Sequence, residues 1–173
     1  FRIHKAESNK GVLDFSHLLD APAGKHGFVE SRNGHFYFED GTRARFIGFN
    51  VAARSNTPDH VTADKMAERF ASMGVNIIRL HAADGPIGDE PGSWSSCREA
   101  PLIDYESGSS RKFHKEGLDR FDYFAAKLKE KGIYLHIDLI VSREFMEADK
   151  LDYPGGAPSC IKRHAMYNER LIE

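Results

Sequence analysis

The sequence predicts an α/β protein built on a parallel sheet. After an N-terminal hairpin, strand-like and helix-like segments alternate along the chain, which is the pattern of α/β folds. A repeat supports this order: Met73-Gly-Val-Asn-Ile-Ile-Arg-Leu-His is similar to Lys131-Gly-Ile-Tyr-Leu-His-Ile-Asp-Leu, and in both a helix ends at glycine and a strand follows. The turns from helix to strand are short, whereas the loops from strand to helix are long. In α/β folds such long loops carry the site, at the carboxyl ends of the strands.

The first part of the chain is predicted to be a lead-in followed by a hairpin. Residues 1–33 are expected to be irregular, with one short strand near their end. Residues 35–39 alternate in polarity, Asp40-Gly41 is a strong turn signal, and residues 43–51 return as a strand. The continuous apolar run at residues 46–49 predicts that this returning strand, the first of the parallel sheet, is buried on both faces.

The first helix has signals at both of its ends. Thr62 is predicted as its N-cap and Gly74 as its C-cap. The apolar stripe between them has helical spacing and consists of Met66, Phe70 and Met73. Residues 75–80 are then expected to form the second strand of the sheet.

The second helix is expected over residues 114–131, and Gly132 ends it. Residues 133–141 are then predicted to form the third strand. A final helix is expected at residues 166–173, and the sequence stops inside it.

Each predicted strand is followed by a polar loop. These loops cover residues 52–61, 82–112 and 142–159. Loops of this length in a compact domain are usually functional. The second loop contains Trp94, the only tryptophan, which serves either as a platform for a sugar ring or as a loop anchor.

Composition excludes two classes of partner. Lys plus Arg number 24 and Asp plus Glu number 26, so the net charge is −2. The chain therefore lacks the basic excess that nucleic acids and anionic membranes attract. No apolar run approaches the roughly 18 residues that cross a bilayer. We expect neither a nucleic acid nor a membrane as a partner.

Cysteines and chain ends leave the compartment open. Cys97 and Cys160 can form one bridge at most, and two thiolates cannot build a four-thiolate zinc site. The chain begins without Met or a signal-peptide pattern, so we expect both of its ends to be trimmed, and its localisation stays unknown.

Polar side chains gather where the predicted strands end. They are Asn50 in the first strand, Arg79 and His81 in the second, and His136 and Asp138 in the third. The strand period of two places Arg79 and His81 together on one side, opposite Leu80 on the helix side. A buried guanidinium needs a carboxylate or several other acceptors. Arg79 therefore forms either a core ion pair, with Asp138 or another carboxylate, or part of a site, and its place at the strand end favours a site.

Simpler interpretations remain open for the other polar residues. His136 alone is typical of a hydrogen-bonded core histidine, and Asn50 can simply tie down the first loop. Asp84 and Asp89 lie in a Gly- and Pro-containing loop and are typical turn formers.

The sequence carries no recognisable cofactor motif. His81, Asp84, His136 and Asp138 offer nitrogen and oxygen ligands, but their spacing matches neither His-x-His nor His-Glu-x-x-His. No Gly-x-Gly-x-x-Gly or Gly-Lys-Ser/Thr loop follows the first strand. We therefore predict no metal and no cofactor.

Three motifs follow one another along the chain. Residues 34–50 are Gly-His-Phe-Tyr-Phe-Glu-Asp-Gly-Thr-Arg-Ala-Arg-Phe-Ile-Gly-Phe-Asn, residues 73–80 are Met-Gly-Val-Asn-Ile-Ile-Arg-Leu, and residues 131–139 are Lys-Gly-Ile-Tyr-Leu-His-Ile-Asp-Leu. In this order they resemble the (β/α)8-barrel glycoside hydrolases of the cellulase-like family 5 group and its clan relatives. The first motif is similar to the hairpin and first strand of those barrels, the second to their second strand, whose arginine supports the nucleophile, and the third to their third strand. The resemblance covers about residues 34–141. By position it carries over Arg79, Asn50 and Asp138, whereas His81, His136 and Trp94 are candidates from their placement alone.

The resemblance implies a retaining mechanism with two glutamates, an acid/base and a nucleophile about 5 Å apart. They come from the ends of barrel strands four and seven, so both lie outside this chain. Asn168-Glu169 imitates the acid/base motif, but it lies in a helical context, and we interpret Glu169 as an ordinary helix residue. Ile140 stands where many relatives have a sugar-binding histidine, a departure that argues against that contact here.

We therefore expect a TIM (β/α)8 barrel, of which residues 1–33 are a lead-in and residues 34–173 supply the hairpin and the first three β/α units. Units of about 45 residues would make a barrel of well over 300, within the range that insertions allow. The expected function is hydrolysis of β-linked O-glycosidic bonds, with an oligo- or polysaccharide as substrate and the remainder of the barrel as partner. Two alternatives stay open: a non-catalytic small-molecule or carbohydrate-binding α/β domain, and a metal-dependent TIM-barrel hydrolase.

Overall fold

The computed structural model of the 173-residue chain describes residues 11–86 and 100–151. The chain divides into two compact units, and each is described by itself. The sheet unit comprises Phe1–Val51, Pro58–Leu80 and Asp122–Ile137. The loop unit comprises Ala52–Thr57, His81–Phe121 and Asp138–Glu173. Several features named above lie outside the described residues: Asp89, Trp94, Cys97, Cys160 and the final helix expected at residues 166–173.

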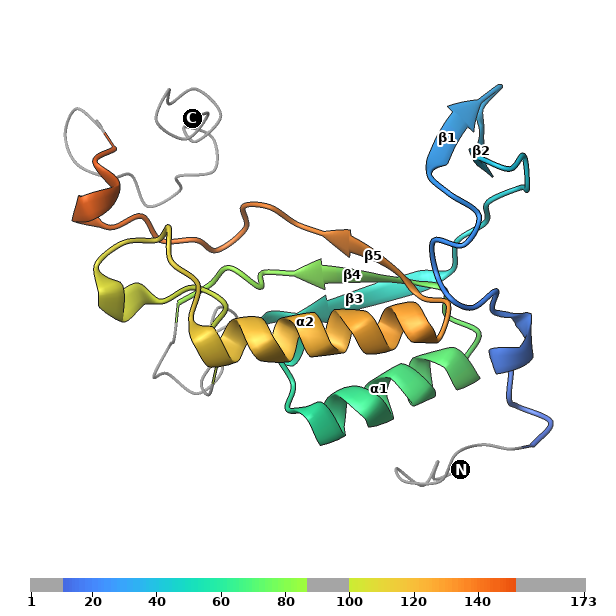
Figure 1. Cartoon of the computed structure of the whole chain (residues 1–173), viewed down its shortest axis with the longest axis horizontal. Helices are drawn as coiled ribbons and strands as arrows, with labels where there is room; N and C mark the ends of the chain where they lie inside the picture. The colour runs from blue at the N-terminus through green and yellow to red at the C-terminus, as the bar shows by residue number, and fades with distance from the viewer. Residues whose placement is uncertain (1–10, 87–99, 152–173) are drawn as a thin grey trace. The chain divides into compact units, whose positions relative to one another are not determined.

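A three-stranded parallel sheet forms the centre of the sheet unit. Its strands are β3 (Gly48–Ala52), β4 (Ile77–His81) and β5 (Tyr134–Ile137), in the order β3-β4-β5. The three arrows point the same way in Figure 1. In the parallel pair of β4 and β5, Ile77 lies opposite Tyr134 and Leu80 lies opposite Ile137. The predicted α/β class with a parallel sheet is confirmed, and the closed barrel remains a prediction.

Helix α1 spans His60–Ser72, and its N-cap lies three residues before the predicted one. Asp59 is the N-cap, and its Oδ1 accepts the backbone N–H of Thr62 at 2.8 Å. The prediction of Thr62 as the cap was wrong, because the Thr62 hydroxyl itself donates to Asp59 Oδ2 at 2.8 Å. At the other end Gly74 has φ +72°, the left-handed conformation that glycine adopts without a Cβ penalty, so the predicted C-terminal stop is confirmed.

Helix α2 (Lys115–Glu130) confirms the second predicted helix within one residue at each end. In the sheet unit its second half lies beside α1 (Figure 1). The Tyr123 hydroxyl donates to Asp64 of α1 at 3.0 Å, and the rings of Tyr123 and His60 stack with centroids 3.8 Å apart. A stacked ring and a hydrogen bond thus join the two helices.

The apolar core of the sheet unit follows from the period of β4. Burial alternates along this strand: Ile78 and Leu80 are fully buried, whereas Ile77, Arg79 and His81 are half-buried. Phe124 and Leu128 of α2 are fully buried as well. Burial of each such side chain contributes about 1.5–3 kcal/mol. The prediction that Arg79 and His81 lie on one side of this strand and Leu80 on the other is confirmed.

The N-terminal hairpin uses a different turn from the predicted one. Its strands are β1 (Val29–Arg32) and β2 (His35–Phe38), joined at Asn33-Gly34. Both turn residues have positive φ (51° and 74°), as a two-residue hairpin of type I′ requires. After Asp40-Gly41 the chain returns only as an isolated bridge between Tyr37 and Arg43. The single strand expected over residues 43–51 was wrong, since β3 starts at Gly48 and joins the other sheet.

The expected two-sided burial of residues 46–49 was also wrong. Ile47 is 71% exposed and Phe49 is 39% exposed. Phe49 packs edge-to-face on Phe70 of α1, with centroids 5.0 Å apart. The first three residues of β3, Gly48, Phe49 and Asn50, are exposed, so this strand is not covered on both faces.

The third strand is shorter than predicted and ends at Ile137, so Asp138 directly follows it.

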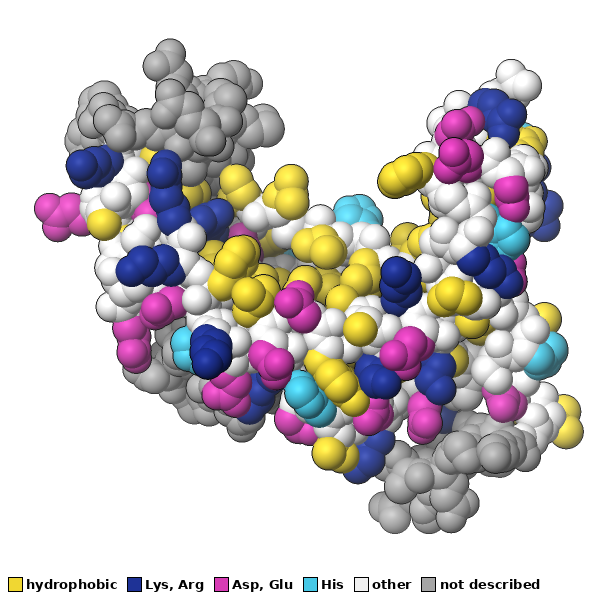
Figure 2. Space-filling view, in the orientation of Figure 1, with side chains coloured by type: hydrophobic (Ala, Val, Ile, Leu, Met, Phe, Trp, Pro, Cys, Tyr) yellow, Lys and Arg dark blue, Asp and Glu magenta, His cyan; other side chains and the backbone are white. Residues whose placement is uncertain are grey.

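Within residues 11–86 and 100–151, no helix is long and apolar enough to cross a membrane. On the face shown in Figure 2, Lys and Arg side chains are interspersed with Asp and Glu side chains, in keeping with the net charge of −2.

Candidate functional site

Two residues predicted from the strand ends meet in the loop unit. His81 is the last residue of β4, and Asp138 is the first residue after β5. His81 Nδ1 lies 2.6 Å from Asp138 Oδ2. The His81 side chain is 35% exposed and the Asp138 side chain 12%. The pair therefore combines a largely buried carboxylate with an imidazole that solutes can reach.

The contact fixes the roles of the two ring nitrogens. An ionised carboxylate only accepts hydrogen bonds, so Nδ1 of His81 carries a hydrogen and donates it to Asp138. In the neutral ring Nε2 is then an acceptor. Within the described residues nothing hydrogen-bonds to Nε2. The ring thus offers one oriented acceptor.

Asn56 holds the backbone of His81. Its side chain is fully buried, and Nδ2 donates to the His81 carbonyl at 2.7 Å. Its Oδ1 is a buried acceptor that has no donor among the residues described. The neighbouring Thr57 hydroxyl donates to the Ala100 carbonyl at 2.8 Å. The segment after β3 is therefore tied to the end of β4 and to the loop beyond it.

Asp84 joins the loops that follow β4 and β5. It is 6% exposed, and its carboxylate accepts the backbone N–H of Val141 at 2.7 Å and that of Ser142 at 2.9 Å. These partners lie nearly 60 residues further along the chain. Its interpretation from sequence as a local turn former misses this role, because residue type and loop context say nothing about distant partners.

Tyr105 makes a second connection between the same loops. Its hydroxyl donates to the Asp84 carbonyl at 2.6 Å and accepts the backbone N–H of Glu144 at 3.2 Å. Burial raises the pKa of Tyr105 to about 12. The phenol therefore keeps its hydrogen at neutral pH and can donate it.

A third connection uses Asp149, which is 3% exposed. It accepts the Ser109 hydroxyl at 2.8 Å, the Ser110 N–H at 3.0 Å and the Met146 N–H at 2.7 Å. Burial alone would raise its pKa, but hydrogen bonds from Met146, Ser109 and Ser110 outweigh burial and lower it. Arg143 adds hydrogen bonds to the Ser110 hydroxyl, at 3.1 Å, and to the Ser110 carbonyl. No local sequence pattern marks Asp149 or Tyr105, so neither was predicted as a site residue.

Other predicted site residues lie in the sheet unit. Arg79 on β4 and His136 on β5 are opposite one another in the parallel register. Asn50 lies on edge strand β3 and is exposed. The structure thus brings Arg79 and His136 to the same level of neighbouring strands. Trp94 is outside the described residues.

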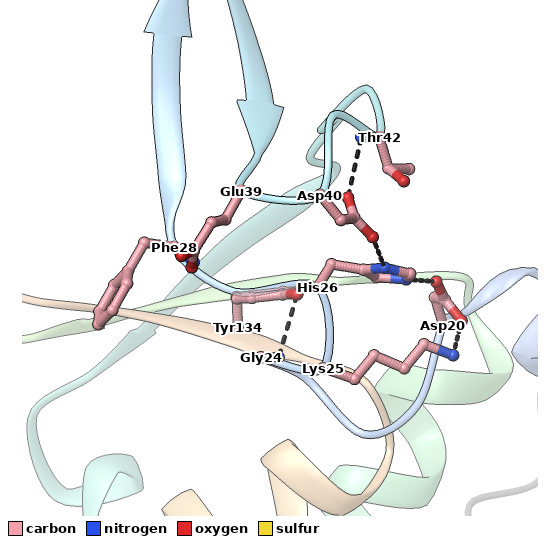
Figure 3. Close-up of polar contacts among 9 residues, drawn as sticks. All are labelled: Asp20, Gly24, Lys25, His26, Phe28, Glu39, Asp40, Thr42 and Tyr134. Carbon is pink, nitrogen blue, oxygen red and sulfur yellow. Dashed lines mark hydrogen bonds and ion pairs between the residues drawn. The ribbon is translucent and has the colours of Figure 1, made fainter.

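The sheet unit also holds a polar cluster that the sequence did not reveal (Figure 3). His26 Nδ1 lies 2.5 Å from Asp40 Oδ2, and Nε2 contacts Asp20, which also binds Lys25. Because both ring nitrogens face carboxylates, both must be donors, so the ring is an imidazolium. This cluster fastens the lead-in to the segment that follows the hairpin.

Four residues near the strand ends carry nitrogen or oxygen atoms of the kind that ligate metals: His81, Asp84, His136 and Asp138. Among residues 11–86 and 100–151, no three His, Cys, Asp or Glu side chains lie close enough together to hold a metal ion. The carboxylate of Asp84, one of the four, is instead used by two backbone N–H groups.

Comparison with known proteins gives a weak likeness to glycoside hydrolases. The sequence matches no family model and no curated protein. A solved structure described as a glycoside hydrolase family 5 protein from Bacteroides vulgatus ATCC 8482 is similar over 69% of this chain and 26% of its own, with 14% identity and a TM-score of 0.46. Another, described as a glycoside hydrolase, gives 15% identity with the same coverage and TM-score.

This chain therefore spans about a quarter of the length of those structures, 26% in each case. A TM-score of 0.46 does not establish a common fold. The family and the activity consequently stay proposals, and they rest on the residues of this chain.

Proposed function

We propose that this chain supplies the N-terminal hairpin and the first three β/α units of a (β/α)8-barrel glycoside hydrolase. The whole enzyme would cleave β-linked O-glycosidic bonds by a retaining mechanism, and both of its catalytic glutamates would lie outside these 173 residues. The ordered motifs around Asn50, Arg79 and Asp138 support this proposal, as does the parallel sheet with its long polar loops. The role of this chain is to bind substrate and to place Arg79 beside the nucleophile.

The single observation that carries the proposal is the contact between His81 and Asp138 at the ends of β4 and β5. Ligands of α/β folds bind at the carboxyl ends of the strands. A pyranose presents hydroxyl groups that both donate and accept, so it needs oriented polar partners. Asp138 orients the ring, and the exposed edge of His81 offers Nε2 as an acceptor for one sugar hydroxyl.

The sheet itself supports the expected partner, the remainder of the barrel. Among the described residues β3 and β5 are the edge strands of the sheet, and they also leave side chains exposed: Phe49 and Asn50 on β3, and His136 and Ile137 on β5. Exposed strand edges pair readily with further strands. We propose that further strands of the same enzyme cover these edges.

Calorimetric titration of the purified chain tests the proposal. A panel of β-linked tetrasaccharides of glucose, mannose and xylose serves as ligand. We expect one of them to bind, and His81→Ala to weaken that binding by about tenfold, the value of a single lost hydrogen bond. Asp149→Asn is the control, because it alters a buried carboxylate of the same unit that does not contact the pair. Absence of binding, or equal affinity of His81→Ala, would overturn the proposal.

A further inference from the structure

We infer that Asp84 is a positioning residue. Through its hydrogen bonds to the backbone that follows Asp138, it sets the geometry of the His81–Asp138 pair. The structural part of this inference rests on hydrogen bonds within the loop unit alone. Its consequence for sugar binding rests on the proposed function.

Asp84 connects the same two segments of the chain as the contact between His81 and Asp138. Asp84 lies three residues after His81, and the N–H groups that it binds lie three and four residues after Asp138. Two short segments, 81–84 and 138–142, are therefore joined twice. His81 and Asp138 join them at one end, and the Asp84 carboxylate joins them at the other. The ring closed in this way fixes the separation of its members.

The backbone of the first segment supplies independent support. Ala82 has φ +54°, although it carries a Cβ, and it is only 5% exposed. A non-glycine residue persists in this left-handed region only where the surrounding structure imposes it. Ala82 lies between the two side chains of the segment that make these long-range hydrogen bonds, His81 directly before it and Asp84 two residues further on. The strained turn at Ala82 directs His81 and Asp84 toward the same partner segment.

Burial makes the Asp84 connection hard to replace. A carboxylate that is 6% exposed needs its donors, and the two backbone N–H groups need their acceptor. Tyr105 reinforces the connection, since its hydroxyl bridges the Asp84 carbonyl and the Glu144 N–H. An amide at position 84 would offer one acceptor oxygen in place of two, so one backbone N–H would lose its partner.

Asp149 provides the matched control. It is as buried as Asp84, belongs to the same unit, and also accepts backbone N–H groups, those of Ser110 and Met146. It does not bracket the His81–Asp138 pair. A change at Asp149 should therefore loosen the loop unit without altering the histidine.

The experiment uses the full chain labelled with ¹⁵N at histidine. The NMR signals of the His81 ring nitrogens report how much of the ring carries its hydrogen on Nδ1, and calorimetry with the tetrasaccharide panel reports affinity. For Asp84→Asn we expect the Nδ1–H form to lose its dominance and affinity to fall by about tenfold, a middle value for coupled residues. For Tyr105→Phe we expect a smaller change in the same direction, and for Asp149→Asn no change at His81.

The outcomes separate the inference from the proposed function. Unchanged His81 signals in Asp84→Asn would overturn the inference, as would an equal change in Asp149→Asn. If Asp84→Asn does not fold, Tyr105→Phe decides the question: altered His81 signals support the inference, and wild-type signals overturn it. If the His81 signals respond as expected but no tetrasaccharide binds to the wild type, the inference holds and the proposed function fails.

Discussion

His26 is an imidazolium held between Asp20 and Asp40 (Figure 3). Its hydrogen bonds, first that to Asp20 and then that to Asp40, raise its pKa above the ordinary 6.5. The pKa of Asp20 is lowered, mainly by Lys25 and then by His26. The pKa of Asp40 is lowered first by the Thr42 N–H and then by His26. The cluster is solvent-exposed, so salt screens it.

These shifts predict how stability depends on pH. A raised His26 pKa gives a stabilisation that is complete below pH 6.5 and disappears as the pH rises through the folded-state pKa. The lowered pKa values of Asp20 and Asp40 give a second stabilisation. It is present above about pH 3.8 and disappears as the pH falls through the folded-state pKa values of these two carboxyl groups. Urea unfolding between about pH 5 and about pH 9 should show the free energy of unfolding declining on the alkaline side. His26→Asn should remove that decline, and an identical slope in this variant would contradict the assignment.

Asp59 gives a second prediction at the scale of one residue. Asp59→Ala removes the acceptor of the Thr62 N–H at the start of α1. The free energy of unfolding should fall by about 1 kcal/mol, the usual cost of losing an N-cap. Asp59→Asn keeps an acceptor and should cost clearly less. Equal losses in both variants, measured by urea unfolding, would show that the charge rather than the cap matters.

Some residues of the candidate site could be predicted from the sequence and others could not, for a physical reason. His81 and Asp138 were identified because a strand end is a local feature and parallel strands bring their ends together. The roles of Asp84, Asp149 and His26 depend on partners that lie far along the chain, and no local spacing encodes them. Thr62 was confused with Asp59 as a cap because both residue types favour that position.

At the scale of one element, α2 makes an unusually close approach in the loop unit. The Gly117 N–H donates to His114 Nδ1 at 3.2 Å, and a Cβ on Gly117 would overlap the carbonyl oxygen of Pro101. The helix therefore needs glycine here, although glycine weakens a helix interior by about 1 kcal/mol relative to alanine.

Gly117→Ala consequently has a predicted sign opposite to its helix propensity. We expect a loss of about 1–3 kcal/mol in the free energy of unfolding, because the segment at Pro101 must move. Glu116→Ala, on the neighbouring exposed position, should change stability by less than about 0.5 kcal/mol. A stabilised Gly117→Ala variant would contradict the close packing.

Helix α2 was predicted well, α1 was predicted with the wrong N-cap, and the hairpin was predicted with the wrong turn. Helical periodicity and a C-terminal glycine are local signals, and they placed α2 within one residue. Two turn signals, Asn33-Gly34 and Asp40-Gly41, lie close together, and hairpin register depends on which of them closes the ladder. The exposure of Ile47 depends on which elements pack over its side chain, which an apolar run cannot reveal.

At the scale of the whole molecule, the proposal predicts that the 173-residue chain has no glycosidase activity. On this proposal the chain would bind sugar, and both catalytic glutamates would lie outside it, so bond cleavage would have no acid/base and no nucleophile. Release of nitrophenol from aryl β-glycosides, and of reducing ends from β-glucan, should stay at the buffer level. Turnover that follows the purified chain through chromatography would place the catalytic carboxylates within it and contradict the proposal.

Sequence periodicity defined the β/α order of the molecule, but closure of a barrel is a property of strands beyond β3, β4 and β5. For that reason the class of fold is confirmed and the barrel remains a proposal. The same limit applies to the proposed function, since the His81–Asp138 pair belongs to this chain while the proposed reaction depends on residues outside it.

The most direct test of the central claim is the ¹⁵N signal of His81 Nε2 during titration with the tetrasaccharide that binds. Of the nine histidines, we expect His81 to respond saturably, because Nε2 accepts a hydrogen bond from a sugar hydroxyl. His26 and His35 of the sheet unit should keep their positions. An unchanged His81 signal at a sugar concentration that saturates binding would contradict the account.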